Sequence, residues 1–363
     1  MRRLRLAVLS AVVFANSSPA RGEHPVPQTF AKPVECGRWI LPAEGEASQP
    51  LWGVKGGVAV GLWPKIGPRG LLRIYAPNLG HSPDRMVNFI AIEPIVNGVR
   101  GYSELEKSSL DGRNGKAMWT GDDFDAEPKP RAPWRPARGR ITGAGRSEAL
   151  AFHLFVEPFD NGAQVVIKVV LRQDRPYEVS LTTFAADGSA SMNACVLTAT
   201  MGNFGRLRDL WLRDDIVRST LLFRDAKLDE HGFFPPRHWF ADRLLNVDGD
   251  LIAAAASNEF DPARGNVKEM KRSWRYIGKP ATHYWKTRAD DPKCVVRVNG
   301  RRTYWPDKTG GEELIPGGAS YENFELETPF SPGREFRFGV TPEPPESLGF
   351  SPALREKIID HGK

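Results

Sequence analysis

Three glutamates lie close together in the segment NFIAIEPIVNGVRGYSELEKS, residues 88–108. Glu93 stands in the middle of an apolar run, where an ionised carboxylate is costly unless it is paired or lines a wet cleft. Two interpretations of Glu93 stand side by side. It ends a strand and pairs with an arginine such as Arg73, or it projects from a sheet face into a substrate groove.

The second part of the same segment has a structural explanation for one of its glutamates. Ser103 and Glu106 form the S-x-x-E pattern of a capping box, in which both side chains satisfy backbone donors at the start of a helix. This pattern predicts a short helical turn near residues 103–109. Glu104 has no comparable local role and stays a candidate for chemistry beside Glu93.

Two aromatic segments carry the histidines of interest, HGFFPPRHWF at 231–240 and ATHYWKT at 281–287. Histidine exchanges protons near neutral pH, and aromatic faces suit the apolar face of a sugar ring. For the first segment, an aromatic loop buried against the sheets is an equally good interpretation. The predicted catalytic residues are Glu93, Glu104, Glu322, His238, His283 and Tyr284. The predicted substrate-binding residues are Asn203, Arg206, Arg237, Trp239, Trp285 and Trp305.

A strand that ends in a turn supplies the arginine and the asparagine of that set. The run LTATMGNFGRLRDLW, residues 197–211, passes from apolar residues into a Gly-Asn turn. Arginine offers a bidentate fork to a carboxylate, so Arg206 with Asn203 could grip a sugar. The alternative is a plain strand end followed by a surface helix, because Leu207, Leu210 and Trp211 have partial helical spacing over 207–217.

The elements that must position these residues read as strands joined by turns. Glycine (35) and proline (30) are spread along the chain between short apolar runs. Asn161-Gly162 is a strong hairpin signal. We predict an all-β protein, a large antiparallel β-sandwich or supersandwich with few short helices. The expected strands cover 57–63, 70–76, 87–96, 148–159, 163–173, 177–186, 194–201, 250–257, 293–300 and 335–341. One domain is expected over 21–345, with a short helix and tail over 346–363.

The segment YENFELETPFSPGREFRFGVTP, residues 321–342, has a glutamate-bearing strand, a Pro-Gly turn and a closing strand. With the meander at 148–202, it resembles galactose mutarotase-like β-supersandwich domains. The resemblance implies sugar chemistry, with a late glutamate as base and an upstream histidine as acid. Glu322 or Glu325 matches the first role. The second role is open among His153, His231, His238 and His283.

The first twenty residues have the features of a secretory signal peptide. Arg2, Arg3 and Arg5 precede an apolar stretch over 6–15, and small residues close the segment. The stretch is too short to span a membrane. We therefore expect a secreted or periplasmic protein with no stable membrane insertion. Loss of three arginines takes the formal charge from +6 to +3 (6 − 3), a modest excess that does not argue for nucleic acid.

Other sites receive little support from the sequence. The three cysteines have no zinc-site spacing, although Cys36 and Cys294 could pair in an oxidising compartment. No cofactor is expected; the acidic turns over 122–125 and 248–250 are of a kind that can hold calcium, although ordinary acidic turns are far commoner. The cationic stretch 129–140 is interpreted as a solvated loop in preference to a polyanion site.

These observations together predict an exported carbohydrate-active enzyme that acts on a polysaccharide or oligosaccharide. Hydrolysis would use two carboxylates, Glu93 with Glu104 or with Glu322. Lyase-type elimination would use a base from His238, His283 or Tyr284 and an arginine such as Arg206. One alternative is a non-catalytic sugar-binding or cell-envelope protein. Another is a mutarotase-like sugar epimerase with a compact pocket.

Overall fold

The computed structural model describes residues 29–45, 47–64, 68–79, 86–124, 135–200, 206–257, 279–303 and 314–359. Several predictions fall outside these ranges. They are the signal peptide over 1–20, the substrate-binding residues Asn203 and Trp305, Asp125 of one acidic turn, and residues 129–134 of the cationic stretch.

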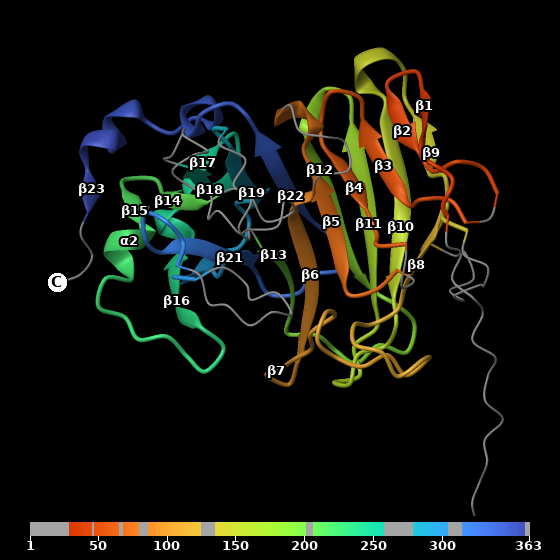
Figure 1. Cartoon of the computed structure of the whole chain (residues 1–363), viewed down its shortest axis with the longest axis horizontal. Helices are drawn as coiled ribbons and strands as arrows, with labels where there is room; N and C mark the ends of the chain where they lie inside the picture. Colours follow the sequence, from red (N-terminus) through yellow and green to blue (C-terminus); the bar gives the residue numbers. More distant parts are fainter. Residues whose placement is uncertain are drawn as a thin grey trace, which may run out of the picture.

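Two large sheets pack against each other, which confirms the predicted all-β sandwich (Figure 1). The first sheet has the strand order β1-β2-β3-β4-β5-β6-β13-β21-β20-β16, with β7 beside β6. Its strands are β1 (Val34–Cys36), β2 (Trp39–Leu41), β3 (Leu51–Val54), β4 (Ala59–Gly61), β5 (Leu71–Tyr75), β6 (Met86–Val96), β7 (Val99–Arg100), β13 (Ala194–Thr200), β16 (Phe233–Phe240), β20 (Val295–Arg301) and β21 (Ser320–Glu327).

The second sheet has the order β23-β15-β14-β18-β19-β22-β12-β11-β10-β8, with β17 beside β18 and β9 beside β10. Its strands are β8 (Met118–Gly121), β9 (Arg140–Thr142), β10 (Ala149–Val156), β11 (Val165–Arg172), β12 (Arg175–Ala185), β14 (Leu207–Trp211), β15 (Ile216–Arg218), β17 (Leu245–Val247), β18 (Asp250–Ser257), β19 (Thr282–Arg288), β22 (Arg334–Thr341) and β23 (Ile358–Ile359). Pairing is antiparallel except between β15 and β23.

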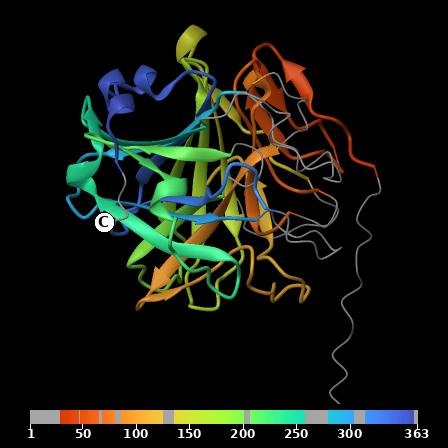
Figure 2. The ribbon, with the colours of Figure 1, turned by 60° about the vertical axis from the view of Figure 1, so that its left-hand side comes forward.

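Helix is confined to short pieces in the described residues. They are α2 (Ser219–Leu222) and the 3-10 turns η1 (Pro77–Leu79), η2 (Gly145–Ser147), η3 (Ala241–Arg243), η6 (Pro345–Leu348) and η7 (Pro352–Glu356). The last two lie over the outer side of the second sheet (Figure 2), where Phe350 and Leu354 pack against Ile252 and Tyr284. No helix in the described ranges is both long and apolar enough to cross a bilayer.

The predicted helix over 207–217 is wrong, because residues 207–211 form the strand β14. Every residue of β14 is buried, so the apolar spacing reflects a strand covered on both faces and not one stripe of a helix. Even Arg208 is buried, and its guanidinium donates to backbone carbonyl oxygens of Pro316 and Ala319. Such internal acceptors let a charged residue occupy a buried strand.

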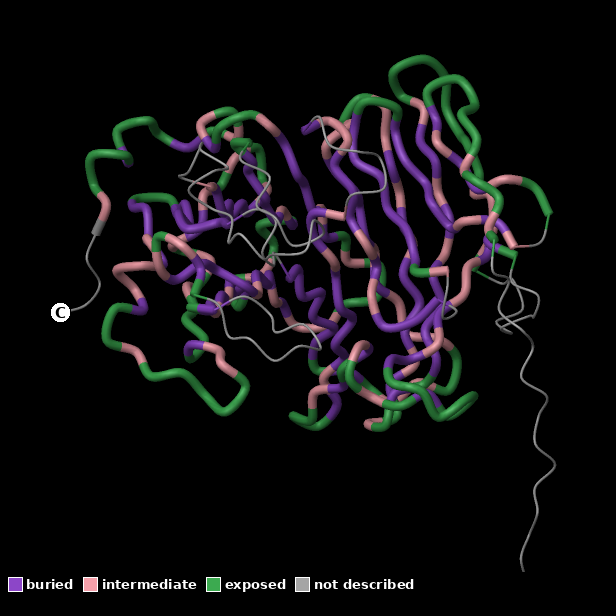
Figure 3. Tube along the Cα trace, in the orientation of Figure 1, coloured by how far each residue is buried: buried purple, intermediate pink, exposed green. Residues whose placement is uncertain are grey.

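Apolar side chains from both sheets fill the space between them. Buried residues run along the strands of both sheets, and exposed ones gather in the connecting loops (Figure 3). Hydrogen bonds also cross this interface. The indole nitrogen of Trp285 on β19 donates to the carbonyl oxygen of Phe324 on β21 at 2.9 Å, and the hydroxyl of Tyr321 donates to the carbonyl of Val217 at 2.8 Å. The core-facing side of the first sheet is therefore closed, and its other side is the one available for a site.

Candidate functional site

The far side of the first sheet carries a row of polar residues at its centre. β13 lies between β6 and β21, and Thr198 stands directly opposite Glu325. Side chains alternate between faces along a strand, so Glu93, Thr198 and Glu325 point away from the core-facing Leu197 and Phe324. Three neighbouring strands that face the core on one side thus each deliver one polar side chain to the other side.

A single arginine joins the two glutamates. The Nη2 atom of Arg100 forms an ion pair with Glu93, lies 2.9 Å from Oε1 of Glu325 and donates to Oγ1 of Thr198 at 3.1 Å. The Thr198 hydroxyl in turn donates to Glu325 at 3.1 Å. The side chains of Glu93 and Glu325 are only 5 % and 10 % exposed. Three strands and one hairpin therefore converge on a compact group of opposite charges.

A two-residue turn explains how Arg100 reaches the row. Asn97 and Gly98 both adopt positive φ, 49° and 78°, and Val96 pairs with Val99 across them. This turn folds β7 back along β6, because its twist matches that of the flanking strands. Arg100 consequently lies opposite Ile95, and its long side chain reaches across the polar face.

Burial and neighbouring charges shift the pKa values of Glu93 and Arg100. Burial raises the pKa of Glu93 to about 8; Arg100 opposes this shift, while Glu104 and Glu325 reinforce it. For Arg100, burial acts to lower the pKa, but Glu325 and Glu93 raise it above its ordinary value. The raised pKa favours the protonated form of Glu93 near neutral pH, whereas Glu325 accepts hydrogen bonds from a cation and a hydroxyl.

Tyr102 and Glu104 border the same group. The guanidinium of Arg100 lies 6.0 Å from the centre of the Tyr102 ring, which is partly exposed. Burial raises the pKa of Glu104, which also acts electrostatically on Glu93. Glu104 is thus near enough to Glu93 to affect its pKa, as is Glu325.

The glutamate of the predicted capping box bonds to a different backbone nitrogen from the one expected. Glu106 accepts a hydrogen bond from the backbone nitrogen of Tyr102 at 2.9 Å and not from that of Ser103, and residues 103–105 form a turn instead of a helix. Ser103 ties this turn to the sheet: its hydroxyl accepts from the nitrogen of Ile92 at 2.9 Å and donates to the carbonyl of Gly70. Glu106 therefore has a structural role, as inferred, but it accepts from the residue before Ser103.

Arg73, the sequence-based partner of Glu93, lies elsewhere on the face. Its guanidinium stacks over the ring of Trp63 at 4.7 Å.

Toward the other edge of the first sheet, Arg297 pairs with Glu327 at 2.9 Å and stands opposite both Glu325 and His238. His238 is exposed and two strands from Glu325, roughly 10 Å by the strand spacing. It shares the polar face but does not contact the glutamates.

The late glutamate that contacts Arg100 is Glu325. Glu322 lies three residues earlier on β21 and is 2 % exposed. The register of β21 against β20 shifts between Tyr321 and Phe324, and this bulge interrupts the alternation of side chains between the two glutamates. The pairing of Glu325 with Thr198 and its contact with Arg100 place Glu325 in the group that holds Glu93.

The segment predicted to supply a base and an aromatic platform belongs to the protein interior. His283 is fully buried on β19, its Nδ1 lies 3.2 Å from the amide of Asn88, and burial lowers its pKa to about 3. Tyr284 faces the opposite side and donates to Glu178 at 3.1 Å; burial and Glu178 raise the tyrosine pKa. Trp285 lies within the core. These positions are inconsistent with catalytic or substrate-binding roles at an open face.

The remaining predicted binding residues are scattered. Arg206 precedes β14 and is 1 % exposed, with a positive φ of 42°. Arg237 is exposed on the edge strand β16, while its neighbour Trp239 packs against the core. Burial of Arg206 and Trp239 removes both from a surface grip on sugar.

Acidic turns proposed for calcium hold other partners. Asp122 accepts from the backbone nitrogen of Gly139 at 2.7 Å, and Asp250 pairs with Arg337. Among the described residues, no three His, Cys, Asp or Glu side chains are grouped to hold a metal ion. The three cysteines are free; Cys36 is exposed, whereas Cys195 and Cys294 are buried.

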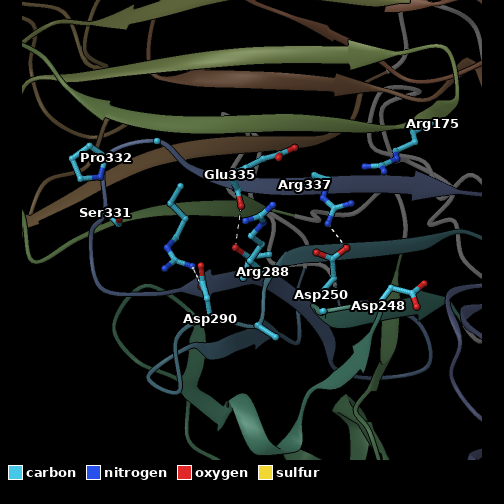
Figure 4. A pocket seen from close by; sticks show the side chains of 14 residues that line it. Arg175, Asp248, Asp250, Arg288, Asp290, Ser331, Pro332, Glu335 and Arg337 are labelled. Atoms are coloured by element: carbon cyan, nitrogen blue, oxygen red, sulfur yellow. Dashed lines mark hydrogen bonds and ion pairs between the residues drawn. The ribbon is translucent and has the colours of Figure 1, made fainter. Parts of the chain in front are cut away.

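Two hollows accompany the sheets. The larger, about 890 Å³, lies beside the second sheet and has charged walls that include the pairs Arg337–Asp250 and Arg334–Asp290 (Figure 4). The smaller, about 470 Å³, adjoins the polar face of the first sheet and includes Ile95 and Glu327 in its wall. Only the smaller one continues the row that holds Glu93 and Glu325.

Sequence reasoning found Glu93 and Glu104 and named Glu325 as one of two late glutamates, but it missed Arg100 and Thr198. The Asn97-Gly98 dipeptide was the available signal, since such a turn returns Arg100 to the flank of the strand that carries Glu93. No local signal marked Thr198, because its partner Glu325 is more than a hundred residues away.

No protein-family model matches this chain, and no curated protein matches it. Among solved structures, it is similar to a "putative aldose 1-epimerase" from Klebsiella pneumoniae subsp. pneumoniae, with 9 % identity and a TM-score of 0.38 over 88 % of this chain and 86 % of the other. This match agrees with the predicted resemblance to galactose mutarotase-like domains. It also corrects the leading prediction of a hydrolase or lyase, since the matching protein carries the name of the epimerase alternative.

Proposed function

We propose that the polar face of the first sheet binds an aldose and that Glu93 and Glu325 interconvert its anomers. One observation carries this proposal: two glutamates share one arginine, burial raises the pKa of Glu93, and Glu325 accepts hydrogen bonds from the arginine and from Thr198. Two carboxyl groups in different environments are a common source of a matched acid and base. Anomer exchange needs this combination, because one proton is removed while another is delivered.

The reaction can be written on these groups. Glu325 takes the proton from the anomeric hydroxyl as Glu93 gives its proton to the ring oxygen, and the bond between the anomeric carbon and the ring oxygen breaks. The open aldehyde turns about its bond to the neighbouring carbon. Ring closure reverses both proton transfers on the other face of the carbonyl. Arg100 contacts both carboxyl groups and stabilises the charge that develops on them during the reaction.

A second candidate is a sugar-binding protein without catalysis. It is favoured by the same arginine, because Arg100 engages both carboxylates directly and leaves them little exposed. If a sugar cannot displace that contact, the polar face can bind hydroxyl groups but cannot exchange protons. Binding without turnover would identify this case.

The test is polarimetry of freshly dissolved α-anomers of a panel of aldoses, with the purified protein added. We expect faster anomer exchange for at least one aldose. Glu325→Gln and Glu93→Gln should each lower kcat by roughly 10²- to 10⁴-fold, the usual contribution of one acid or base. Glu230→Gln, an exposed glutamate away from the row, serves as the matched control. Unchanged exchange with every aldose, or full activity in Glu325→Gln, would refute the proposal.

A further inference from the structure

Two of the strands that carry the row of Glu93, Thr198 and Glu325 separate from each other at one end; they are β13 and β21. Pairing of β13 with β21 covers only Thr198–Thr200 and Asn323–Glu325. β13 nevertheless begins earlier, at Ala194, and β21 continues to Glu327. The 470 Å³ hollow lies between these unpaired ends. Its wall is formed by Ile95, Asn97, Gly98, Asn193, Ala194, Lys293, Glu327, Thr328 and Pro329.

The hollow is a direct continuation of the row. Ile95 follows Glu93 by two residues and Glu327 follows Glu325 by two, so both share the face of the glutamates. Ala194, which pairs with Ile95, completes this next row. Two residues along a strand correspond to roughly 7 Å. A ligand larger than one sugar ring, placed with its reacting end at the glutamates, would extend into this hollow.

The wall has the composition of a ligand site. Ile95, Ala194 and Pro329 supply an apolar surface, as ligand pockets generally do. Thr328 is 4 % exposed, and its hydroxyl has no hydrogen-bond partner within the described part of the chain. A buried hydroxyl left unpaired costs free energy, so a bound hydroxyl group would stabilise it.

The polar groups of the wall favour a neutral ligand over a phosphate. Glu327 is already paired with Arg297, and Asn193 accepts from the nitrogen of Gly98 at 3.1 Å. Among the described residues that line the hollow, Lys293 is the one cation, and it is exposed. A phosphate site would gather several charge-assisted donors around one small group. The hollow instead offers single donors and acceptors spread over a volume typical of small-molecule pockets.

We propose that this hollow holds the second sugar unit of the substrate, so that the protein acts on the reducing end of a neutral disaccharide or longer oligosaccharide. The inference rests on the proposed anomer exchange at Glu93 and Glu325 and adds the class of substrate. The ring at the glutamates reacts, and the ring in the hollow supplies binding energy.

The experiment compares kcat/KM for three substrates: an aldohexose, a neutral disaccharide with that hexose at its reducing end, and the hexose 6-phosphate. We expect the disaccharide to exceed the hexose by about tenfold or more, the equivalent of about 1.4 kcal/mol. Thr328→Val and Lys293→Gln should each lower the ratio of disaccharide to hexose. Lys55→Gln, on a remote strand end, should leave the ratio unchanged.

Several results would overturn the inference: a preference for the free hexose, a preference for the phosphate, or an unaltered ratio in both variants. Lys293 is exposed, so its variant remains informative if Thr328→Val fails to fold. If no sugar is turned over, the proposed anomer exchange is refuted, but sugar binding in the hollow is not. Calorimetric binding of the disaccharide then decides, because loss of affinity in Lys293→Gln would still support the hollow as a sugar site and unchanged affinity would reject it.

Discussion

The carboxyl group of Glu93 owes its chemistry to its position on β6. Burial disfavours its charged form and raises the pKa to about 8, although Arg100 lies beside it. A carboxylic acid that keeps its proton at neutral pH can donate it, which an ordinary surface glutamate cannot.

The rate of anomer exchange should therefore decline as pH rises through about 8, because Glu93 then loses the proton that it must deliver. Measuring kcat between pH 6 and 10 (a range chosen around that pKa) gives the profile. In Glu93→Gln the residual rate should lack this decline. A flat profile in the unsubstituted protein would mean that another group donates the proton.

His283 should make stability depend on acidity. Its pKa is lowered to about 3 by burial, against 6.5 for the unperturbed group, so the unfolded chain binds the proton first. The free energy of unfolding should fall as pH drops below 6.5, with a slope that approaches about 1.4 kcal/mol per pH unit. Urea denaturation of His283→Gln should show that slope reduced. Equal slopes in both proteins would place the neutral state of His283 in doubt.

Among the strands, β19 and β22 have one contact that depends on a missing side chain. Gly339 stands opposite Tyr284, and a Cβ atom at Gly339 would meet the tyrosine ring at 2.0 Å. The tyrosine cannot swing away freely because its hydroxyl is bonded to Glu178. The glycine therefore makes room for a buried polar contact on the outer side of the second sheet.

Gly339→Ala should cost about 3 kcal/mol of unfolding free energy or more, at the upper end of the range for overpacked sites. Thermal and urea denaturation measure the loss. Adding Tyr284→Leu should restore part of it, since the clashing ring is then gone. Additive losses in the double variant would contradict a clash between these two positions.

Sequence patterns predicted the strands well and the partners of their side chains less well. Alternation and Asn-Gly turns are local, so the run around Glu93 and the hairpin at Asn161 could be identified from neighbouring residues. The sequence could not choose between Glu322 and Glu325, because both lie on one late strand and only pairing with the distant Thr198 places Glu325. The run from His283 to Trp285 has sugar-site composition, but its burial depends on a sheet assembled from distant segments.

For the whole molecule, the contact between sheets is partly polar. Trp285 on the second sheet donates to the carbonyl of Phe324 on the first sheet. Phe324 directly precedes Glu325. The same indole packs beside Phe338 with ring centres 4.8 Å apart. One side chain thus links the core to the strand that carries the proposed base.

Trp285→Phe should lower the free energy of unfolding by about 1–3 kcal/mol, because it leaves a buried carbonyl unpaired and a void beside Phe338. Urea denaturation is the measurement. Trp63→Phe, at a 37 % exposed position, should change stability by less than about 0.5 kcal/mol. If both substitutions cost the same, the cross-sheet hydrogen bond contributes nothing of its own.

The chain order of the charged row has a consequence for biosynthesis. Glu93, Arg100 and Thr198 are translated well before Glu325, which follows Thr198 by 127 residues. Until β21 emerges from the ribosome, β13 lacks that neighbour, and Arg100 has Glu93 but not Glu325 beside it. Such non-local pairing is slow to form and leaves an open strand edge meanwhile. A nascent chain arrested before residue 320 would therefore lack the proposed base and be prone to associate with other chains or with chaperones.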